Sequence, residues 1–345
     1  MVVKADRQGN LHSNDIVSVA DLSDLFKQDP AATVTVRVRY SNLNYKDGMI
    51  VQGRTGVVPS FPIVPGIDAA GTVIDTTSQD FTIGDEVVVT GNKIGQHFDG
   101  GFSQLLRVKA EWLLPLPAAF TLKESMMIGS AGVTAMQCVM HLEEHAGLTP
   151  SKGEVLVTGA AGGLGSIAVS ILSSLGYTVC ASSSRAELLE EYFKALGAAR
   201  VIGRLEHKPN RPLGPQLWAG AVDSVGGDTL AAVLSHTKYR CGVASTGVAG
   251  GGELNASVYP FILRGIRLLG VDSTLPYNVE GYPEEDNEKW LQERTRIWTR
   301  LENDLDPEKL HVISHRTIGL SEVREWSETI LSGGVQGRVV VDVDS

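Results

Sequence analysis

The stretch from Val155 to Gly165 constrains the fold more than any other part of this chain. It reads VLVTGAAGGLG, so a short run rich in β-branched residues passes directly into glycines and alanines. Apolar residues then recur at helical spacing as far as Leu175, which predicts a helix with one apolar face. A strand, a tight glycine turn and a helix bind the pyrophosphate of a dinucleotide, because the missing side chains admit the phosphates and the helix N-terminus offers N–H groups.

The glycine turn predicts contacts between the backbone and the cofactor. Its spacing, Ala160-x-Gly162-x-x-Gly165, fits the dinucleotide fingerprint with alanine in the first position. A glycine-rich turn that binds nothing is the alternative, because the fingerprint alone is a weak signal. The residues expected to surround the pyrophosphate are Ala160, Ala161, Gly162, Gly163, Leu164 and Gly165.

The tip of the next predicted strand indicates which dinucleotide is bound. The strand from Tyr177 to Ala181 ends in SSSR, with Ser183, Ser184 and Arg185 and no acid. A site for NAD usually places an aspartate or glutamate there, on the ribose 2′-hydroxyl. Hydroxyls and a guanidinium suit a 2′-phosphate instead, since arginine binds phosphate bidentately. Although Ser184 could also cap a helix starting near Arg185, the tip favours NADPH over NADH.

Composition excludes several classes of partner. The chain has 345 residues, which favours two domains, and a net charge of −10, which argues against binding nucleic acid or an anionic membrane. No apolar run approaches the length of a membrane span, and the N-terminus does not read as a secretory signal. The three cysteines are far apart in sequence, as in a reducing compartment. We therefore expect a cytoplasmic protein.

The chain divides into a strand-rich part and a part in which strands and helices alternate. Up to about Leu122, short strands such as Thr33 to Tyr40 lie between turn residues, which predicts a partly open β-barrel. Beyond a helix expected from Thr134 to about Glu144, the alternation predicts a doubly wound parallel sheet. An acidic, proline-containing link follows, and the strand from Arg338 to Val343 is expected to return to the first domain. The expected domains are 1–122 with 275–345, and 123–274.

Several segments carry a resemblance to a known family. They include SNLNYKD (41–47), PGIDAAGTV (65–73), VTGAAGGLGS (157–166), WAGAVDSVGG (218–227), PFILRGIRLLGVDS (260–273) and VQGRVVV (335–341). In these the chain resembles a zinc-free medium-chain dehydrogenase/reductase of the quinone oxidoreductase type, and it is most similar to the acryloyl-CoA reductase branch. The resemblance implies an α/β fold with a GroES-like, partly open β-barrel catalytic domain and a Rossmann cofactor domain. It also implies a site in the cleft between them and a homodimer.

The residues also predict that no metal takes part. Asn44 and Asp68 stand in the neighbourhoods where the family's zinc ligands would sit, and no cysteine pair has CxxC spacing. His97 is a lone histidine of the barrel region, and such a residue is more often a surface residue than a ligand. Without a Lewis acid, reduction of a conjugated carbon–carbon double bond is the better supported chemistry. It needs a hydride at the β-carbon, charge stabilisation at the carbonyl oxygen and a proton at the α-carbon.

The NYKD segment supplies the expected catalytic residues. Tyr45 is expected to hydrogen-bond the nicotinamide or the substrate carbonyl, and to supply the proton directly or through water. An aromatic wall of the pocket is an equally good interpretation of Tyr45. Asp47 is expected to orient its surroundings, although a turn-capping aspartate would look the same. Asn44 is expected to position Tyr45 or the nicotinamide.

Further cofactor contacts are expected along the second domain. Ser224 stands at a strand tip, and parallel sheets bind ligands at their carboxyl ends. A flexible turn is the alternative for GVAGGG (247–252), and a solvated surface residue is the alternative for Arg204. The residues expected to touch the cofactor, besides Tyr45 and the glycine turn, are Thr134, Ser183, Ser184, Arg185, Arg204, Ser224, Val248, Gly251 and Arg338, the last at a phosphate.

The resemblance predicts the function. It implies NADPH-dependent reduction of a short 2-enoyl-CoA, with acryloyl-CoA converted to propanoyl-CoA. A reductase of quinones or of α,β-unsaturated ketones is the first alternative, and a non-catalytic NADPH-binding protein is the second. The segment NKIGQHFD (92–99) lacks the tryptophans and the extra glycine of the bacterial reductases, which leaves the acyl chain length open. Basic residues are expected near the phosphates of CoA, and Arg264 and Arg267 serve either there or at a dimer interface.

Overall fold

The chain forms two compact units in the computed structural model, which describes residues 1–5, 11–15, 27–54, 56–208, 211–273 and 285–345. The first unit comprises Met1–Ser130, Thr274–Glu302 and Ser314–Ser345. The second comprises Ala131–Ser273 and Asn303–Ile313. The acidic link predicted between the domains lies largely at 274–284, outside the described residues.

These units differ from the predicted ranges in two places, and packing explains both. Helix α2 (Leu122–Ala146) begins well before the expected Thr134 and is kinked at Gly129, so the residues up to Ser130 belong to the first unit. Helix α8 (Pro307–Ile313) packs against α3 (Gly163–Ser174), which puts residues 303–313 in the second unit. Neither the early start of α2 nor the contact between α8 and α3 leaves a local signal in the sequence.

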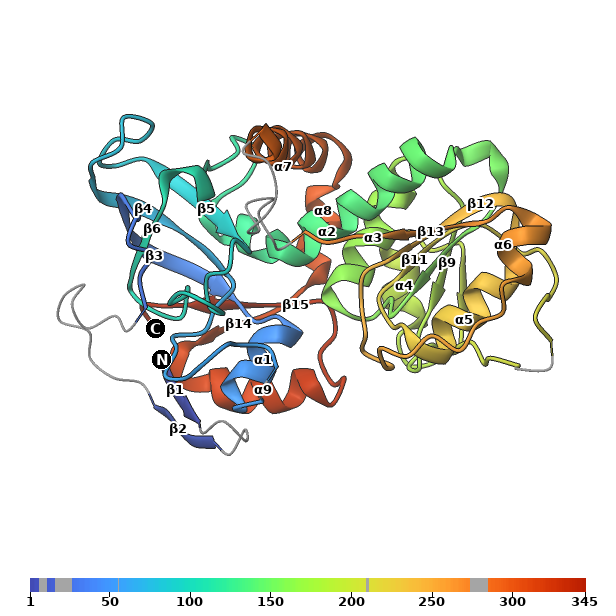
Figure 1. Ribbon diagram of the computed structural model, residues 1–345, viewed down its shortest axis with the longest axis horizontal. Helices are drawn as coiled ribbons and strands as arrows, with labels where there is room; N and C mark the ends of the chain where they lie inside the picture. Colours follow the sequence, from blue (N-terminus) through green and yellow to red (C-terminus); the bar gives the residue numbers. More distant parts are fainter. Residues whose placement is uncertain (6–10, 16–26, 55, 209–210, 274–284) are drawn as a thin grey trace. The chain divides into compact units, whose positions relative to one another are not determined.

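A seven-stranded sheet forms the first unit (Figure 1). Its order is β14-β15-β3-β4-β5-β7, and β6 also pairs with β3. The strands are β3 (Val34–Asn42), β4 (Asp68–Thr76), β5 (Glu86–Thr90), β6 (Leu105–Val108), β7 (Leu114–Pro115), β14 (Ser314–Gly319) and β15 (Arg338–Asp342). In strand β3 the predicted alternation holds only in part: Val34, Val36 and Val38 are buried and Arg37 is exposed, but Thr35 is buried as well. Strand β15 pairs with β3, which confirms the predicted return of the C-terminal strand to the first domain.

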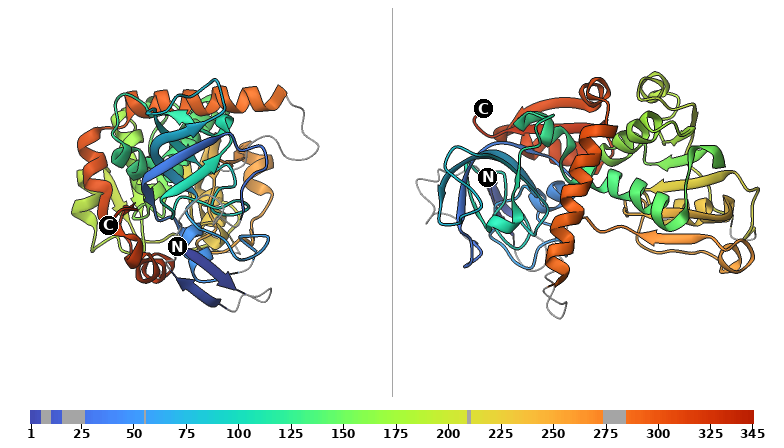
Figure 2. Two further views of the ribbon diagram at one scale, coloured as in Figure 1. Left: turned by 90° about the vertical axis from the view of Figure 1, so that its left-hand side faces the viewer. Right: turned by 90° about the horizontal axis from the view of Figure 1, so that it is seen from above.

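Smaller elements surround this sheet. Strands β1 (Val2–Ala5) and β2 (Leu11–Asp15) form a separate antiparallel pair (Figure 2). Helix α1 (Tyr45–Val51) packs against α9 (Val323–Leu331), and α7 (Glu285–Asp304) is a longer helix of the C-terminal part. The contact between α1 and α9 joins segments far apart in sequence, and the hydrogen bond from Gln52 to Ser327 fixes the end of α1.

The second unit is a six-stranded parallel sheet in the order β10-β9-β8-β11-β12-β13. The strands are β8 (Val155–Thr158), β9 (Val179–Ser182), β10 (Arg200–Ile202), β11 (Trp218–Asp223), β12 (Thr237–Ser245) and β13 (Arg267–Gly270). Helices α3, α4 (Glu190–Ala195), α5 (Gly227–His236) and α6 (Tyr259–Arg264) lie along the connections. The chain starts in the middle at β8, winds outward through β9 and β10, and then continues from β11 on the other side. This order confirms the predicted doubly wound sheet.

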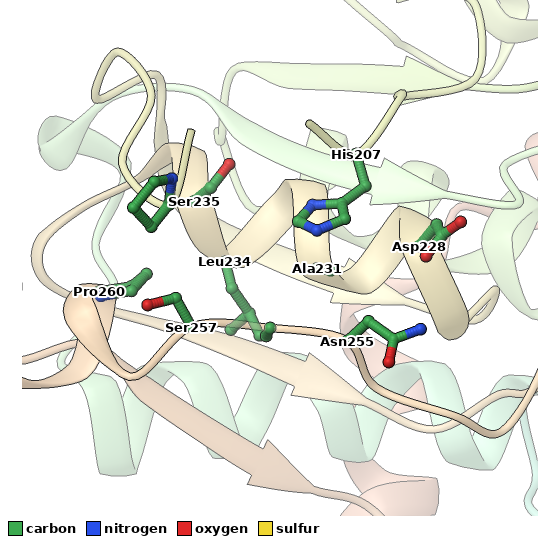
Figure 3. A pocket seen from close by; sticks show the side chains of 10 residues that line it. His207, Asp228, Ala231, Leu234, Ser235, Asn255, Ser257 and Pro260 are labelled. Atoms are coloured by element: carbon green, nitrogen blue, oxygen red, sulfur yellow. The ribbon is translucent and has the colours of Figure 1, made fainter. Parts of the chain in front are cut away.

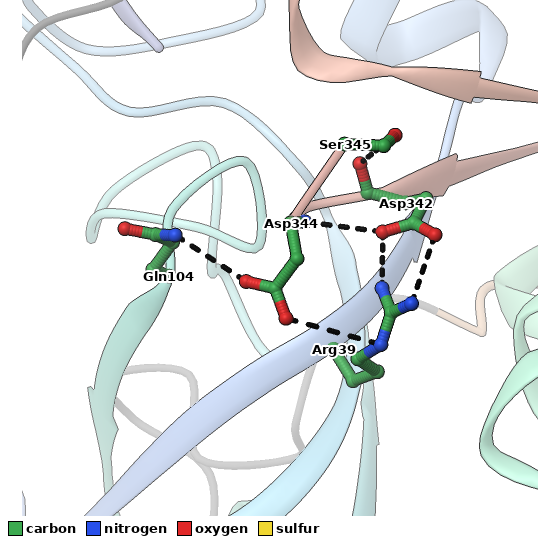
Figure 4. A network of polar contacts seen from close by, with 5 residues as sticks. All are labelled: Arg39, Gln104, Asp342, Asp344 and Ser345. Atoms are coloured by element: carbon green, nitrogen blue, oxygen red, sulfur yellow. Dashed lines mark hydrogen bonds and ion pairs between the residues drawn. The ribbon is translucent and has the colours of Figure 1, made fainter.

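A cluster of charges ties the C-terminal end to β3 (Figure 4). Arg39 donates hydrogen bonds to both carboxylate oxygens of Asp342, one of them 3.0 Å long, and its Nε lies 3.8 Å from Asp344 Oδ2. Gln104 Nε2 donates to Asp344 Oδ1 over 3.3 Å. The hydrogen bond from Arg39 lowers the pKa of Asp342. Because Arg39 is partly exposed, water screens this pair, and its effect is to align β15 rather than to supply much stability.

No helix in the described ranges combines the length and apolar character that a bilayer crossing requires. Cys138, Cys180 and Cys241 are all buried as free thiols.

Candidate active site

The glycine turn between β8 and α3 has the geometry that a pyrophosphate requires. Gly162 caps the N-terminus of α3, and the first turn of a helix has N–H groups without partners inside the helix. A side chain at Gly165 would place its Cβ only 2.4 Å from the carbonyl oxygen of Gly159, so that position must be glycine. The N–H of Ala160 donates to the carbonyl of Ser182 over 3.1 Å, which joins the turn to the tip of β9.

Tyr192, which the sequence did not indicate, supports this turn through Ser166. Tyr192 Oη donates to Ser166 Oγ over 2.8 Å, and Ser166 Oγ donates to the carbonyl of Ala160 over 2.9 Å. Burial raises the pKa of Tyr192 to about 12, so the phenol keeps its proton and remains a donor. The role of Tyr192 depends on the contact of α4 with α3, and no local sequence pattern predicts that contact.

The tip of β9 lies at the same edge of the sheet as the glycine turn. Ser183 is buried, and its Oγ accepts a hydrogen bond from the N–H of Arg185 over 3.0 Å. The expected helix near Arg185 begins only at Glu190, so Ser184 does not cap it and is exposed instead. Arg204 is exposed just beyond β10, whose end is tied to β9 because Ser183 N–H donates to the carbonyl of Ile202.

A buried aspartate fixes the other side of the turn. Asp223 Oδ1 accepts a hydrogen bond from Thr158 Oγ1 over 2.6 Å, and its Oδ2 accepts one from the N–H of Gly226 over 2.8 Å. Ser224 Oγ donates to the carbonyl of Thr158 over 3.0 Å. These bonds lock the end of β11 to the end of β8. Burial raises the pKa of Asp223, which was not among the predicted site residues.

The loop after β12 packs onto the same edge. A Cβ at Gly247 would meet the carbonyl oxygen of Ser224 at 2.1 Å, so backbone touches backbone there. Val248 is exposed on this loop, and Gly251 has a φ of +124°. Thr134 is buried elsewhere in the unit and shares a short hydroxyl contact with Ser273. The structure thus gathers the predicted glycine turn, Ser183 to Arg185, Ser224 and the 247–252 loop at the carboxyl ends of the strands.

The predicted catalytic residues open helix α1 in the first unit. Asn44 is the N-cap residue, and Tyr45 follows with 40% of its surface exposed. Asp47 is fully buried; its Oδ2 accepts from the N–H of Asn44 over 2.9 Å, and its Oδ1 accepts from the N–H groups of Gly66 and Ile67 over 3.2 and 3.0 Å. Burial raises the pKa of Asp47 to about 6, while these N–H donors oppose that rise.

A buried polar network continues from Asn44. Its Nδ2 lies 3.1 Å from both Asp47 Oδ2 and Asp68 Oδ2, and Arg338 Nη1 donates to Asn44 Oδ1 over 2.9 Å. Asp68 also accepts from the N–H of Ser130 over 2.9 Å. Arg338 is only 3% exposed, and its Nε donates to the carbonyl of Met127. This position speaks against the expected phosphate contact by Arg338, since the guanidinium is enclosed by the network that holds Asn44.

The relatives of this chain identify its family. Residues 30–118 match the alcohol dehydrogenase GroES-like domain, which confirms that part of the expected fold. Over its whole length the chain is 44% identical to acrylyl-CoA reductase AcuI of Ruegeria pomeroyi, covering 99% of that protein. The chain belongs to the quinone oxidoreductase-like medium-chain dehydrogenase/reductase family.

Two further members of this family have been solved with dinucleotides. YhdH of Escherichia coli K-12, with bound NADPH, is 41% identical with a TM-score of 0.88, and the match covers 99% of each chain. YhfP of Bacillus subtilis, solved with bound NAD, is 41% identical with a TM-score of 0.84, and the match covers 99% of this chain and 98% of that one. YhfP is also named a putative quinone oxidoreductase.

A protein-bound zinc ion needs three or four side-chain ligands close together. Across the ranges that the structure describes, no three His, Cys, Asp or Glu side chains come together in a way that could hold a metal ion. His97 is exposed on the loop after β5. The absence of a catalytic metal stays a prediction.

A separate cavity of about 600 Å³ lies beside α5 in the second unit (Figure 3). Its lining includes His207, Asp228, Asn255 and Ser257, and none of the predicted site residues. The glycine turn, Ser183 to Arg185, Ser224 and the 247–252 loop lie instead at the carboxyl edge of the sheet, while the predicted contacts Tyr45 and Arg338 belong to the first unit.

We expect Gly129→Ala to disrupt the polar network of the first unit. Gly129 has a φ of +51°, and a Cβ there would lie 2.3 Å from Asn42 Nδ2 and 2.7 Å from Asp68 Oδ2. Backbone strain and overpacking together should lower the free energy of unfolding by about 3–5 kcal/mol. Urea denaturation measures this loss.

Gly84→Ala is the matched control. Gly84 also has a positive φ, +100°, but a Cβ there meets nothing within 4 Å. It should cost only the backbone term, about 1–2 kcal/mol. Equal losses of unfolding free energy in the two variants would show that the side chains around Gly129 shift to accept a Cβ at little cost.

Proposed function

We propose that this protein reduces the carbon–carbon double bond of a short 2-enoyl-CoA with NADPH, and that acryloyl-CoA is the preferred substrate. The observation that carries this proposal is the similarity to acrylyl-CoA reductase AcuI along the entire chain. The proposal fits an edge of the second unit shaped for a dinucleotide and an exposed phenol held by a rigid network in the first unit.

The second unit offers a fitting place for NADPH. Backbone N–H groups of Ala161 and of Gly163 to Gly165 take the pyrophosphate, while the N–H of Gly162 donates to the carbonyl of Gly159 and closes the turn. Ser183 and Arg185 hold the 2′-phosphate, with Ser184 and Arg204 beside them. The remaining contacts come from Thr134, Ser224, Val248 and Gly251. When bound, NADPH supplies the hydride that reaches the β-carbon of the substrate.

Tyr45 acts on the substrate carbonyl in this proposal. Its exposed phenol donates a hydrogen bond to the thioester oxygen, which stabilises the charge that develops there, and it provides the proton for the α-carbon directly or through water. Asn44 and Asp47 do not reach the substrate themselves. They hold the first turn of α1, so that the phenol does not have to be ordered during the reaction.

Reduction of quinones or free enones is the alternative function. The name of YhfP, a putative quinone oxidoreductase, favours it, and the hydride step would be the same. A protein that binds NADPH without turnover is a further alternative. The exposed phenol of Tyr45, held by the buried network around Asn44, favours an enzyme over a protein that only binds NADPH.

We expect acryloyl-CoA to give a kcat/KM that exceeds those of acrylate, methyl vinyl ketone and 1,4-benzoquinone by orders of magnitude. The measurement is the oxidation of NADPH with each acceptor. In the same assay Tyr45→Phe should lower kcat with acryloyl-CoA about 100-fold, the usual effect of losing a general acid. Faster turnover of the quinone or the ketone would establish a quinone or enone reductase. Tight NADPH binding with no turnover of any acceptor would establish a non-catalytic NADPH-binding protein.

Arg185→Gln should separate the two dinucleotides. Losing a charge-assisted hydrogen bond to the 2′-phosphate should raise the KM for NADPH roughly tenfold to 100-fold and leave the KM for NADH unchanged. Arg316→Gln is the control, since Arg316 is an exposed arginine of the first unit. An equal rise with both dinucleotides would mean that Arg185 does not read the 2′-phosphate.

A homodimer paired along β13 completes the proposal. This strand ends the six-stranded sheet, and an open edge is a template for a second strand. Beside it, Ile262 and Leu263 of α6 are 68% and 57% exposed. We expect light scattering to give twice the mass of the chain and the double variant Ile262→Glu, Leu263→Glu to give a monomer. A monomeric wild type at micromolar concentration contradicts this part.

A further inference from the structure

We infer that Lys46, Lys93 and His97, on helix α1 and the loop after β5, bind the nucleotide phosphates of the CoA thioester. The inference rests on the proposed function and adds to it the part of the protein that recognises the tail of the substrate. All three residues belong to the first unit.

Hydrogen bonds gather these residues around one short loop. The carbonyl of Lys93 accepts the N–H groups of Gln96, His97 and Phe98 over 3.2, 2.9 and 3.3 Å, so the loop closes on Lys93. Gln96 Oε1 lies 3.5 Å from Lys46 Nζ, which joins the loop to α1. Lys46 directly follows Tyr45 in the chain. A path of polar groups therefore runs from the reacting end of the proposed substrate outward along the loop.

The charges along this path are positive. His97 is exposed, while Lys46 and Lys93 are half-buried. Burial and the charges of Lys93 and Lys27 lower the pKa of His97, so the imidazole is mainly neutral at pH 7 and the positive charge of this path belongs to the two lysines. In the described part of the chain, Lys46, Lys93 and His97 form no ion pair with a carboxylate. A local excess of positive charge in a chain of net charge −10 favours a polyanionic ligand.

Neighbouring groups of the described residues hold the base of the loop. Asp99 is buried, and its carboxylate accepts the N–H groups of Lys27 and Val64 over 2.8 and 2.9 Å. Lys27 Nζ donates to Ser60 Oγ over 3.0 Å. Lys27 thus serves the base of the loop, whereas the exposed His97 and the half-buried Lys93 are assigned to the ligand.

The backbone of the loop is strained where Lys93 sits. Asn92 and Lys93 have φ values of +52° and +67°, which are uncommon for residues with side chains. Asn92 is 2% exposed, and its Oδ1 is buried without a hydrogen-bond partner. Such strain persists where the surroundings impose it, and it is frequent at ligand-binding loops.

The substrate supplies the matching chemistry. In a CoA thioester the pantetheine arm separates the reacting acyl group from a diphosphate and a 3′-phosphate. A site for these phosphates must therefore lie away from the reacting group, and Lys93 and His97 belong to a separate loop that Gln96 joins to Lys46 on α1. Lysine donates charge-assisted hydrogen bonds to phosphate oxygens, and the neutral imidazole of His97 offers one N–H donor beside them.

The test compares two thioesters that differ only in the phosphates. In Lys93→Gln we expect the KM for acryloyl-CoA to rise about tenfold, with kcat unchanged, because one charge-assisted hydrogen bond is lost. The KM for acryloyl-pantetheine, which has no nucleotide, should not change. Lys46→Gln lies outside the strained loop and should act in the same direction even if Lys93→Gln folds poorly. Lys152→Gln removes the same charge from an exposed site of the second unit and should change neither KM.

Other outcomes overturn the inference. Equal rises with both thioesters would mean that the loop shapes the acyl pocket, and a weaker affinity for NADPH in Lys93→Gln would mean that the charges serve the cofactor. If the wild type does not reduce acryloyl-CoA at all, the proposed function fails, and calorimetry with adenosine 3′,5′-bisphosphate then judges this site by itself. Binding that Lys93→Gln weakens about tenfold supports the site, and no binding to the wild type refutes it.

Discussion

The hydrogen bond from Arg338 to Asn44 supports the rest of the first unit. It joins the C-terminal strand β15 to the start of α1 and brings one guanidinium into a buried region that also holds the carboxylates of Asp47 and Asp68. Buried charges are costly unless each has a partner, so this network requires every member in place. The network holds the first turn of α1 in place and leaves Tyr45 exposed on its outside.

Close approach of backbones plays the corresponding part in the second unit. Gly165 lies against Gly159, and Gly247 lies against Ser224, at distances that exclude any side chain. Asp223 then fastens two neighbouring strand ends through Thr158 and Gly226. The carboxyl edge of the sheet is therefore rigid and lined with backbone N–H groups, which suits a ligand that carries phosphates.

The two units divide the chemical requirements of the proposed reaction. Hydride transfer needs a dinucleotide held in one orientation, and the second unit supplies the surface for it. Charge stabilisation and proton delivery need a phenol of fixed position, and the first unit supplies Tyr45. The proposed phosphate site at Lys93 and His97 would add recognition of the part of the substrate that does not react, so that binding of the tail helps to place the acyl group.

The sequence alone determined the parts of this protein that depend on neighbouring residues. The strand-turn-helix at Val155 to Gly165, the acid-free tip at Ser183 and the doubly wound order all follow from short-range patterns. The sequence predicts the helix only from Thr134, whereas α2 begins at Leu122, because the kink at Gly129 interrupts the helical pattern.

Only the tertiary structure decided which distant residues meet. Tyr192 beneath the glycine turn, Asp223 between two strand ends and Arg338 inside the polar network rather than at a phosphate are contacts between segments separated by tens to hundreds of residues. The same is true of Lys46 beside Gln96. A local pattern records propensity and periodicity, whereas these contacts depend on how the sheets and helices pack, and packing brings together side chains whose partners the sequence does not mark.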